Sequence, residues 1–125
     1  MYPENYLYSK EHEWISVEDG VATLGITQFA QDELGEVVYL ELPDVGDSFS
    51  VGEEIGTIES VKAVAELYTP VDGEIVERNE AAMDAPEKVN EAPHGEGWLV
   101  KIKLAGEPPA GLMSAAEYQT FTEQG

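Results

Sequence analysis

One lysine stands apart from the other basic residues of the chain and has the chemistry of an acceptor for covalent modification. In the segment IESVKAVAEL, residues 58–67, Lys62 is the only Lys or Arg between Lys10 and Arg78. Its immediate neighbours are small or apolar, so the amine is uncrowded, and a deprotonated lysine amine is a nucleophile. The alternative is a solvated surface lysine that balances nearby carboxylates, which is the ordinary role of an exposed lysine.

The elements around Lys62 are predicted to place it at the tip of a β-hairpin. The stretch before it, GEEIGTIES, and the stretch after it, AVAELYT, are rich in β-branched and apolar residues, as strands are. The segment PVDG then turns the chain again. We therefore expect a hairpin over residues 54–69 with Lys62 exposed at its tip, where an enzyme can reach a side chain without unfolding the protein.

Few other residues offer chemistry. The chain has no cysteine, which excludes disulfides, thiolate metal sites and cysteine nucleophiles. The two histidines, His12 and His94, belong to no ligand or catalytic motif, so we expect packing or surface roles for both. The carboxylates of DELGE and EDG lack the spacing of an EF-hand loop. We therefore predict no catalytic residue and no metal site.

Length and charge limit the classes of function. With 125 residues, of which 42% are apolar, the chain is predicted to fold as a single domain, residues 1–125. A net charge of −20 argues against binding to nucleic acid or to an anionic membrane and favours basic protein partners, although adaptation to high salt gives the same balance. No apolar run is long enough to span a bilayer and no signal-peptide pattern is present, so we expect a cytoplasmic protein.

Alternation of apolar and polar residues between turn signals predicts a sandwich or barrel made mainly of β-strands. In EWISVEDGVATLGI, Asp19-Gly20 predicts a tight hairpin turn. The segment EVVYLELP is predicted to place Val38, Leu40 and Leu42 on one face and Val37 on the opposite face. The segment WLVKIKL is predicted to direct four residues inward and its two lysines outward. The inward residues are Trp98, Val100, Ile102 and Leu104. Trp98 and Trp14 are expected to anchor the core.

Short helices are expected at three places. Thr27 is predicted to cap a helix over QFAQDEL that ends at Gly35, and Ser114 with Glu117 forms a capping box for a C-terminal helix over residues 114–122. A weaker helical turn is expected in DAPEKVNEAP, where Pro86 suits the first helical position.

Four segments together resemble the H-protein family of the glycine cleavage system. They are YSKEHEW, GEVVYLELPDVGDSF, IESVKAVAELYTPVDGEIVERN and VNEAPHGEGWLVKIKL, and they occur in the order and spacing of that family. The resemblance implies a flattened barrel or sandwich of two antiparallel sheets, of the lipoyl-domain type, with short helices outside. It also implies that Lys62 carries lipoate in amide linkage. Biotin carriers usually have methionines beside the lysine, whereas Val61 and Ala63 stand here.

The resemblance assigns further residues. Glu59, three residues before Lys62, and Gly73, eleven after it, match positions that lipoyl domains share and that serve recognition for lipoylation. Glu13 matches the glutamate of the HEW signature and could accept hydrogen bonds from the cationic amine of the loaded arm. Trp14 could line the cleft beside it. His94 stands where family members often have tyrosine, so the family gives no guide to its contact.

The implied function is that of a non-catalytic, monomeric carrier. A pyridoxal-phosphate glycine decarboxylase transfers aminomethyl to the lipoyl arm, a tetrahydrofolate-dependent aminomethyltransferase takes the one-carbon unit, and a dihydrolipoamide dehydrogenase reoxidises the dithiol. A lipoyl-transferring enzyme must first modify Lys62. The alternative is an H-like protein that serves in docking or lipoate relay with Lys62 bare. An autonomous enzyme is disfavoured because no cofactor-binding loop or catalytic arrangement is recognisable.

Overall fold

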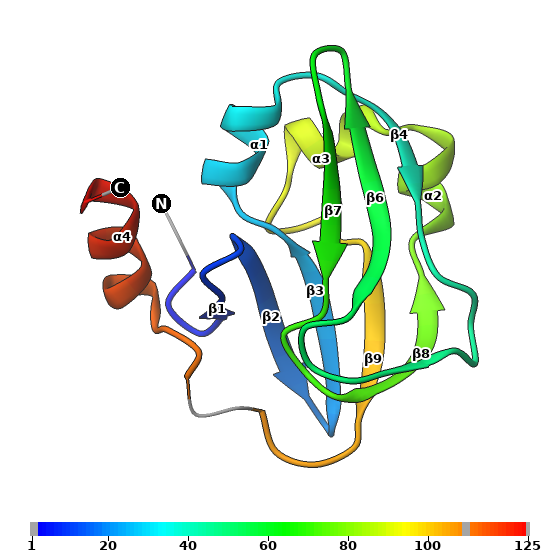
Figure 1. The fold of residues 1–125 in the computed structure, drawn as a ribbon, viewed down its shortest axis with the longest axis vertical. Coiled ribbons are helices and arrows are strands. Elements are labelled where there is room, and N and C mark those ends of the chain that lie inside the picture. The colour runs from blue at the N-terminus through cyan, green and yellow to red at the C-terminus, as the bar shows by residue number, and fades with distance from the viewer. Residues whose placement is uncertain (1–2, 109–110, 125) are drawn as a thin grey trace.

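The computed structural model describes residues 3–108 and 111–124 and contains two antiparallel β-sheets with helices at their periphery (Figure 1). The larger sheet has the strand order β1-β2-β3-β9-β8-β5. Its strands are β1 Leu7–Tyr8, β2 Glu13–Glu18, β3 Val21–Ile26, β9 Val100–Leu104, β8 Gly73–Arg78 and β5 Ser48–Phe49. The smaller sheet has the order β4-β6-β7, formed by β4 Val37–Glu41, β6 Glu54–Ser60 and β7 Val64–Tyr68. The predicted fold class is confirmed.

The first hairpin of the larger sheet forms as its sequence predicts. Asp19 and Gly20 have φ values of 52° and 78°, the left-handed conformation that a tight two-residue turn between β2 and β3 requires. Beyond the turn, Ala22, Leu24 and Ile26 are all buried. Alternate residues of β3 therefore point into the space between the sheets.

The alternation predicted for residues 36–43 is wrong at its start. Val37 is buried and Val38 is 47% exposed, the reverse of the grouping of Val38 with Leu40 and Leu42. The cause is an irregularity between Val37 and Tyr39, where the pairing of β4 with β6 shifts register. Such a bulge inserts one residue and exchanges the faces of the residues before it.

The core lies between the two sheets. Leu40, Ile58 and Leu67 from the smaller sheet and Leu24, Ile75 and Ile102 from the larger one belong to one buried cluster. A second cluster joins Tyr8 and Trp14 to Tyr118 of α4, which spans Ala115–Gln124. Trp14 is a buried anchor as predicted, whereas Trp98 and Leu104, also predicted to point inward, are only partly buried.

The predicted helix caps are present. Helix α1, Gln28–Leu34, begins after Thr27, whose side chain accepts from the N–H of Ala30, and its C-cap is Gly35. At α4, the Ser114 hydroxyl accepts from the Glu117 N–H and the Glu117 carboxylate accepts from the Ser114 N–H. Pro86 directly precedes α3, Glu87–Glu91. A helix that was not predicted, α2 at Glu80–Asp84, is capped by the Asn79 side chain.

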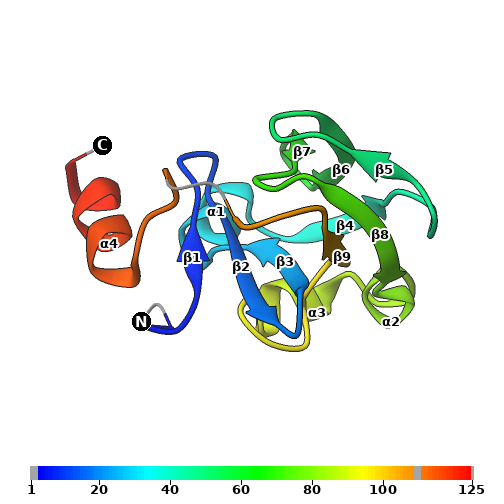
Figure 2. The same cartoon turned by 90° about the horizontal axis from the view of Figure 1, so that it is seen from below.

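The helices lie on different sides of the sheets. Seen from below, α4 lies beside β1, away from α2 and α3 (Figure 2). Helix α1 lies near the end of the hairpin formed by β6 and β7 (Figure 1). The predicted hairpin tip that carries Lys62 therefore lies at the end of the smaller sheet nearest α1 (Figure 1).

Candidate functional site

Lys62 is exposed and lies in the turn between β6 and β7, which is at the top of the molecule in Figure 1. Ser60 holds this turn closed. Its Oγ accepts hydrogen bonds from the N–H groups of Lys62 at 3.3 Å and Ala63 at 3.0 Å, and its own N–H donates to the Ala63 carbonyl at 2.8 Å. The lysine is therefore presented on a short, hydrogen-bonded tip.

The connection between α1 and β4 supports this tip from one side. The Val61 N–H donates to the carbonyl of Glu36 at 3.0 Å. A Cβ atom on Gly35 would lie only 3.3 Å from Cε of Lys62, so the stem of the lysine crosses the bare backbone of that glycine. The sequence predicts Gly35 only as a helix end, and its contact with the side chain of Lys62 is seen only in the structure.

Asn90 of α3 fixes the same connection. Its Nδ2 donates to the Gly35 carbonyl at 2.7 Å, and its Oδ1 accepts from the Val37 N–H at 2.8 Å. One side chain thus holds both ends of the segment on which the hairpin tip rests. Sequence reasoning missed Asn90, because nothing in its local pattern distinguishes it from any other polar helical residue.

Glu59 and Gly73 lie apart in the fold. Glu59 pairs with Tyr39 on one side and with Val64 on the other, close to the hairpin tip. Gly73 begins β8 in the other sheet, at the opposite end of the molecule from the tip (Figure 1). A side chain on Gly73 would collide with the carbonyl of Lys103, so the close pairing of β8 with β9 requires glycine there.

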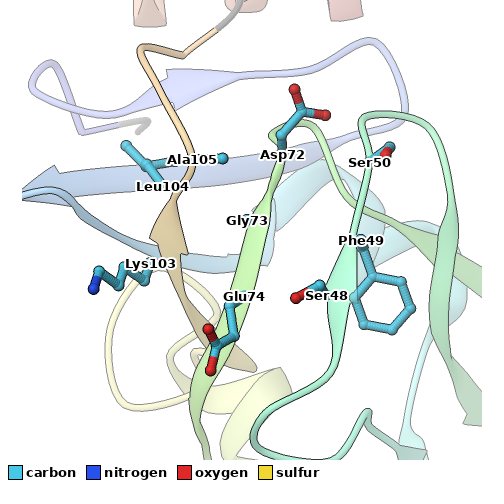
Figure 3. A pocket seen from close by; sticks show the side chains of 9 residues that line it. All are labelled: Ser48, Phe49, Ser50, Asp72, Gly73, Glu74, Lys103, Leu104 and Ala105. Atoms are coloured by element: carbon cyan, nitrogen blue, oxygen red, sulfur yellow. The ribbon is translucent and has the colours of Figure 1, made fainter.

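Gly73 also lies in a hollow of about 410 Å³ over β5, β8 and β9. Figure 3 shows the side chains around it, including Phe49, Asp72 and Lys103. The Asp72 carboxylate accepts from the N–H of Val51 at 2.7 Å and so orders the neighbouring loop. None of the residues that line this hollow comes from the hairpin tip.

A cleft of about 270 Å³ lies between α1, the start of β2 and the hairpin. Its walls are largely apolar. Helix α1 contributes Phe29, Ala30 and Leu34, and the hairpin contributes Ile58, Ala65 and Leu67. Leu34 directly precedes the glycine under Lys62, and Ala65 follows Lys62 by three residues, so the cleft begins beside the lysine.

Glu13 lies in the same cleft and is only 2% exposed. Its Oε2 accepts from the Tyr68 N–H at 3.0 Å and its Oε1 accepts from the Ser9 hydroxyl at 3.0 Å. Burial raises the pKa of Glu13 to about 8, and the two hydrogen bonds only partly oppose that shift. A cation placed beside this carboxyl would favour its ionised form, so Glu13 is suited to hold an amine away from water.

The two histidines support the walls of the cleft. His12 has a φ of 67° and its Nδ1 lies 2.6 Å from the hydroxyl of Tyr118, which in turn lies 2.7 Å from Oγ1 of Thr27. His94 Nε2 accepts from the N–H of Gln28 at 3.0 Å, at the start of α1. Burial lowers the pKa of both, that of His94 to about 4. Each therefore fixes a neighbouring element in its neutral form.

The described residues form neither a metal-binding cluster nor a membrane-spanning helix. Among residues 3–108 and 111–124, no group of three or more His, Asp and Glu side chains is arranged to hold a metal ion. No helix in this part of the chain is both long and apolar enough to cross a membrane. The arrangement around Lys62 offers one accessible amine and an adjacent apolar cleft with a buried carboxyl.

The two-sheet fold, with a lysine at the tip of a hairpin, is of the lipoyl-domain type. The chain belongs to the glycine cleavage H-protein family, whose sequence model matches residues 6–125. It is 56% identical to the glycine cleavage system H protein of Herpetosiphon aurantiacus, over 95% of this chain and 92% of the relative. It is 52% identical to that of Rubrobacter xylanophilus, over 98% of this chain and 95% of the relative.

A solved structure agrees with this assignment. The crystal structure of a glycine cleavage system H protein from Mycobacterium marinum superposes with a TM-score of 0.92 at 37% identity, covering 98% of this chain and 99% of that chain. The resemblance found in the four sequence segments is thus confirmed over nearly the whole chain.

Proposed function

We propose that this chain is the lipoyl carrier of a glycine cleavage system, with residues 1–125 acting as one carrier domain and lipoate attached to Lys62. It would receive aminomethyl from a pyridoxal-phosphate glycine decarboxylase and deliver it to a tetrahydrofolate-dependent aminomethyltransferase. A dihydrolipoamide dehydrogenase would then reoxidise the dithiol. The observation that carries the proposal is the exposed Lys62 on a hydrogen-bonded tip directly beside a cleft.

The residues present fit the attached group. Lipoate supplies the disulfide that a chain without cysteine cannot provide itself. Lys62 would hold the group: its Nζ, after losing one proton, would attack the carbonyl carbon of an activated lipoyl group such as an acyl adenylate. The amide would form as the bond to the leaving phosphate breaks, with the electron pair going to adenylate and a second proton going from Nζ to solvent. No electron is transferred to or from the protein in this step.

Glu59 and Gly73 belong to this proposal as recognition residues of different kinds. Glu59 lies beside the hairpin tip, where an enzyme that modifies Lys62 must approach. Gly73 lies in the other sheet, and we assign its contribution to the close contact between β8 and the Lys103 carbonyl on β9. Gly73 would therefore affect recognition indirectly, by keeping the two-sheet fold that presents Lys62, and not by contacting the enzyme.

The cleft would shelter the loaded arm, and Glu13 would hold its cationic amine. Strand β7 runs from Val64 to Tyr68, a length of about 13 Å at the usual rise of a strand. That is longer than a lysine side chain alone, so only the extended arm would reach the carboxyl that accepts from Tyr68. A carboxylate that binds an ammonium makes a charge-assisted hydrogen bond, roughly twice as strong as a neutral one.

The chain would position and shelter the group and leave bond chemistry to its partner enzymes. A short flexible link raises the effective concentration of the arm at a docked active site to about the millimolar range. Weak docking of the partner enzyme is therefore sufficient for transfer. The protein would therefore act as a carrier without catalytic residues of its own.

Reconstitution tests this proposal. The purified chain is incubated with a lipoyl-transferring enzyme, lipoate and ATP, and modification is followed by intact mass and peptide mapping. We expect one lipoyl-sized increment, on Lys62, which is absent in Lys62→Arg and unchanged in the matched control Lys88→Arg. The modified chain should then support glycine-dependent exchange of carbon dioxide by the decarboxylase. Modification at another lysine, or a modified chain that the decarboxylase does not use, would overturn the proposal.

A further inference from the structure

A row of three residues crosses the outer face of the smaller sheet beside the hairpin tip. Tyr39 of β4 pairs with Glu59 of β6, which pairs with Val64 of β7. The next pairs along the strands, Leu40 with Ile58 and Ile58 with Ala65, supply the buried Leu40 and Ile58 to the core. Because successive residues of a strand face opposite sides, the row itself points outward.

This outer row is unusually apolar for an exposed sheet face. Tyr39 is 51% exposed and Val64 is 62% exposed, and Val61 in the adjoining turn is 66% exposed. The solvent face of an antiparallel sheet normally carries polar residues. Directly opposite residues have Cβ atoms about 4.5–5.5 Å apart, so Glu59 is flanked on both sides by apolar groups. None of these three exposed groups contributes to the buried core.

The strands that carry the row have acidic residues and no basic ones. The next outward row consists of Glu41, Thr57 and Glu66, joined by the same pairing of strands. Strands β4, β6 and β7 contain no lysine, arginine or histidine. Lys101 and Lys103 lie on β9, in the other sheet. Among the described residues of these three strands and of the turn between β6 and β7, Lys62 is the only basic one.

We propose that the row Tyr39–Glu59–Val64, with Val61 at its end, is the docking surface for the lipoyl-transferring enzyme, which meets it with apolar groups flanked by a lysine or arginine. The proposal rests on the proposed function, since it assumes that Lys62 is modified. In addition to Glu59, the enzyme would contact the side chains of Tyr39, Val61 and Val64. The Glu59 carboxylate would lie at the rim of this contact, where its attraction to a basic group of the partner is screened by salt.

Charge and reach favour this partner over others. A second copy of the chain is disfavoured, because its own face carries the same excess of carboxylates on a protein with net charge −20. Enzymes that work on the loaded group are reached through a long arm and can dock further from the tip. The enzyme that acylates Nζ has no arm to reach it, so it must bring its active site to the tip itself.

The binding energy would come from two separable sources. The free energy of apolar contact with Tyr39 and Val64 changes little with salt concentration, whereas attraction between the surrounding carboxylates and a basic partner is screened by salt. Removal of an apolar group should lower affinity at every salt concentration. Removal of the Glu59 charge should lower affinity mostly at low salt and flatten the salt dependence.

The test measures kcat/KM for lipoylation of the unmodified full chain, using a purified lipoyl-transferring enzyme with lipoate and ATP. Tyr39→Ser and Val64→Ser should each lower kcat/KM by at least about fivefold, through KM. Val17→Ser and Val76→Ser serve as matched controls, because these valines are 41% and 39% exposed and lie on the other sheet. Both controls should keep the value of the original protein, and all variants should keep its thermal unfolding midpoint within the error of the measurement.

Salt dependence and a non-reactive chain provide a second readout. Glu59→Gln should flatten the fall of kcat/KM with rising salt, while Tyr39→Ser should keep its slope. In a Lys62→Met background, which cannot be acylated, direct binding to the enzyme should weaken on Tyr39→Ser and remain unchanged on Val17→Ser. Equal kcat/KM and equal binding for the row variants and the controls would overturn the docking proposal.

The outcomes separate the two proposals. If the original chain is lipoylated on Lys62 and the row variants react equally fast, the carrier function stands and the docking surface is wrong. If Lys62 is never acylated, the proposed function itself fails. A further comparison uses Tyr39→Ser and Val64→Ser chains that have been fully lipoylated by long incubation. These chains should support the decarboxylase at the rate of the original chain. If they slow the decarboxylase as much as they slow lipoylation, the surface docks several enzymes, and the proposal that it docks the lipoyl-transferring enzyme alone is wrong.

Discussion

The Oε2 atom of Glu13 accepts a hydrogen bond from the backbone N–H of Tyr68 at 3.0 Å, joining the start of β2 to the end of β7. This contact places a buried carboxyl in the cleft that begins beside Lys62. The larger sheet therefore supplies the carboxyl, and the smaller sheet supplies the lysine. An amine carried on Lys62 could be sheltered beside Glu13 only because the two sheets bring Glu13 and the hairpin that carries Lys62 to the same cleft.

Replacement of Glu13 should affect retention of the loaded group and leave lipoylation intact. In Glu13→Ala, the cationic amine of the arm loses its charged partner, and we expect spontaneous loss of the aminomethyl group to accelerate by about tenfold or more. Release is followed by the appearance of free formaldehyde or ammonia from loaded protein. Glu13→Gln is the matched control for shape: it should also accelerate release, since it cannot ionise. An unchanged rate in both variants would exclude this role.

The buried Glu13 should make the free energy of unfolding depend on pH between about 4.5 and about 8. Its pKa is raised from 4.5 to about 8, so the folded state retains a proton that the unfolded state has lost. The free energy of unfolding should therefore fall as pH rises between these values, by at most about 1.4 kcal/mol per pH unit. Urea unfolding at several pH values between about 5 and about 8 should show a steeper fall in the free energy of unfolding for the original protein than for Glu13→Gln. Parallel slopes would contradict it.

His94 should act in the opposite direction at lower pH. Its pKa is lowered from 6.5 to about 4 by burial, and its neutral Nε2 accepts from the Gln28 N–H at the start of α1. The unfolded state therefore binds the proton first, and stability from this group should be lost as pH falls from about 6.5 to about 4. His94→Gln, whose amide oxygen can accept without titrating, should lose less stability than the original protein across that window. Far-UV circular dichroism in urea measures it.

The seat under Lys62 should require glycine. Gly35 has φ 78° and ψ −148°, a conformation that is essentially confined to glycine, and a Cβ there would press on Cε of Lys62. We expect Gly35→Ala to lower the free energy of unfolding by about 1–3 kcal/mol. Gly20→Ala is a useful comparison, since Gly20 has a positive φ but nothing within 4 Å of its added Cβ. A smaller loss of unfolding free energy for Gly35→Ala than for Gly20→Ala would contradict a specific requirement for glycine under the Lys62 side chain.

Local signals explain which parts of the fold the sequence predicts. The turn at Asp19-Gly20 and the caps at Thr27 and Ser114 depend on residues within a few positions of one another, and all three form as predicted. The helix after Asn79 was missed although its cap residue is of a favoured type, because five residues are too few to show a helical period.

The contacts that build the site join segments far apart in the chain. Glu13 and Tyr68 are separated by 55 positions, as are Asn90 and Gly35. The bulge after Val37 depends on the pairing of β4 with β6 and leaves no mark in the alternation of β4 itself. Sequence reasoning therefore placed Lys62 on its hairpin and named Glu13 through the resemblance, but it found neither Asn90 nor the role of Gly35 under Lys62.

The most direct test of the account is the chemical state of Lys62 in the cells that make this protein. Intact mass and peptide mapping of the protein purified from those cells should show a lipoyl-sized increment on the peptide that contains Lys62 and on no other. Lys62→Arg should abolish both the increment and glycine cleavage. Unmodified Lys62 in cells that actively cleave glycine, or a biotin-sized increment there, would contradict the assignment of this chain as a lipoyl carrier.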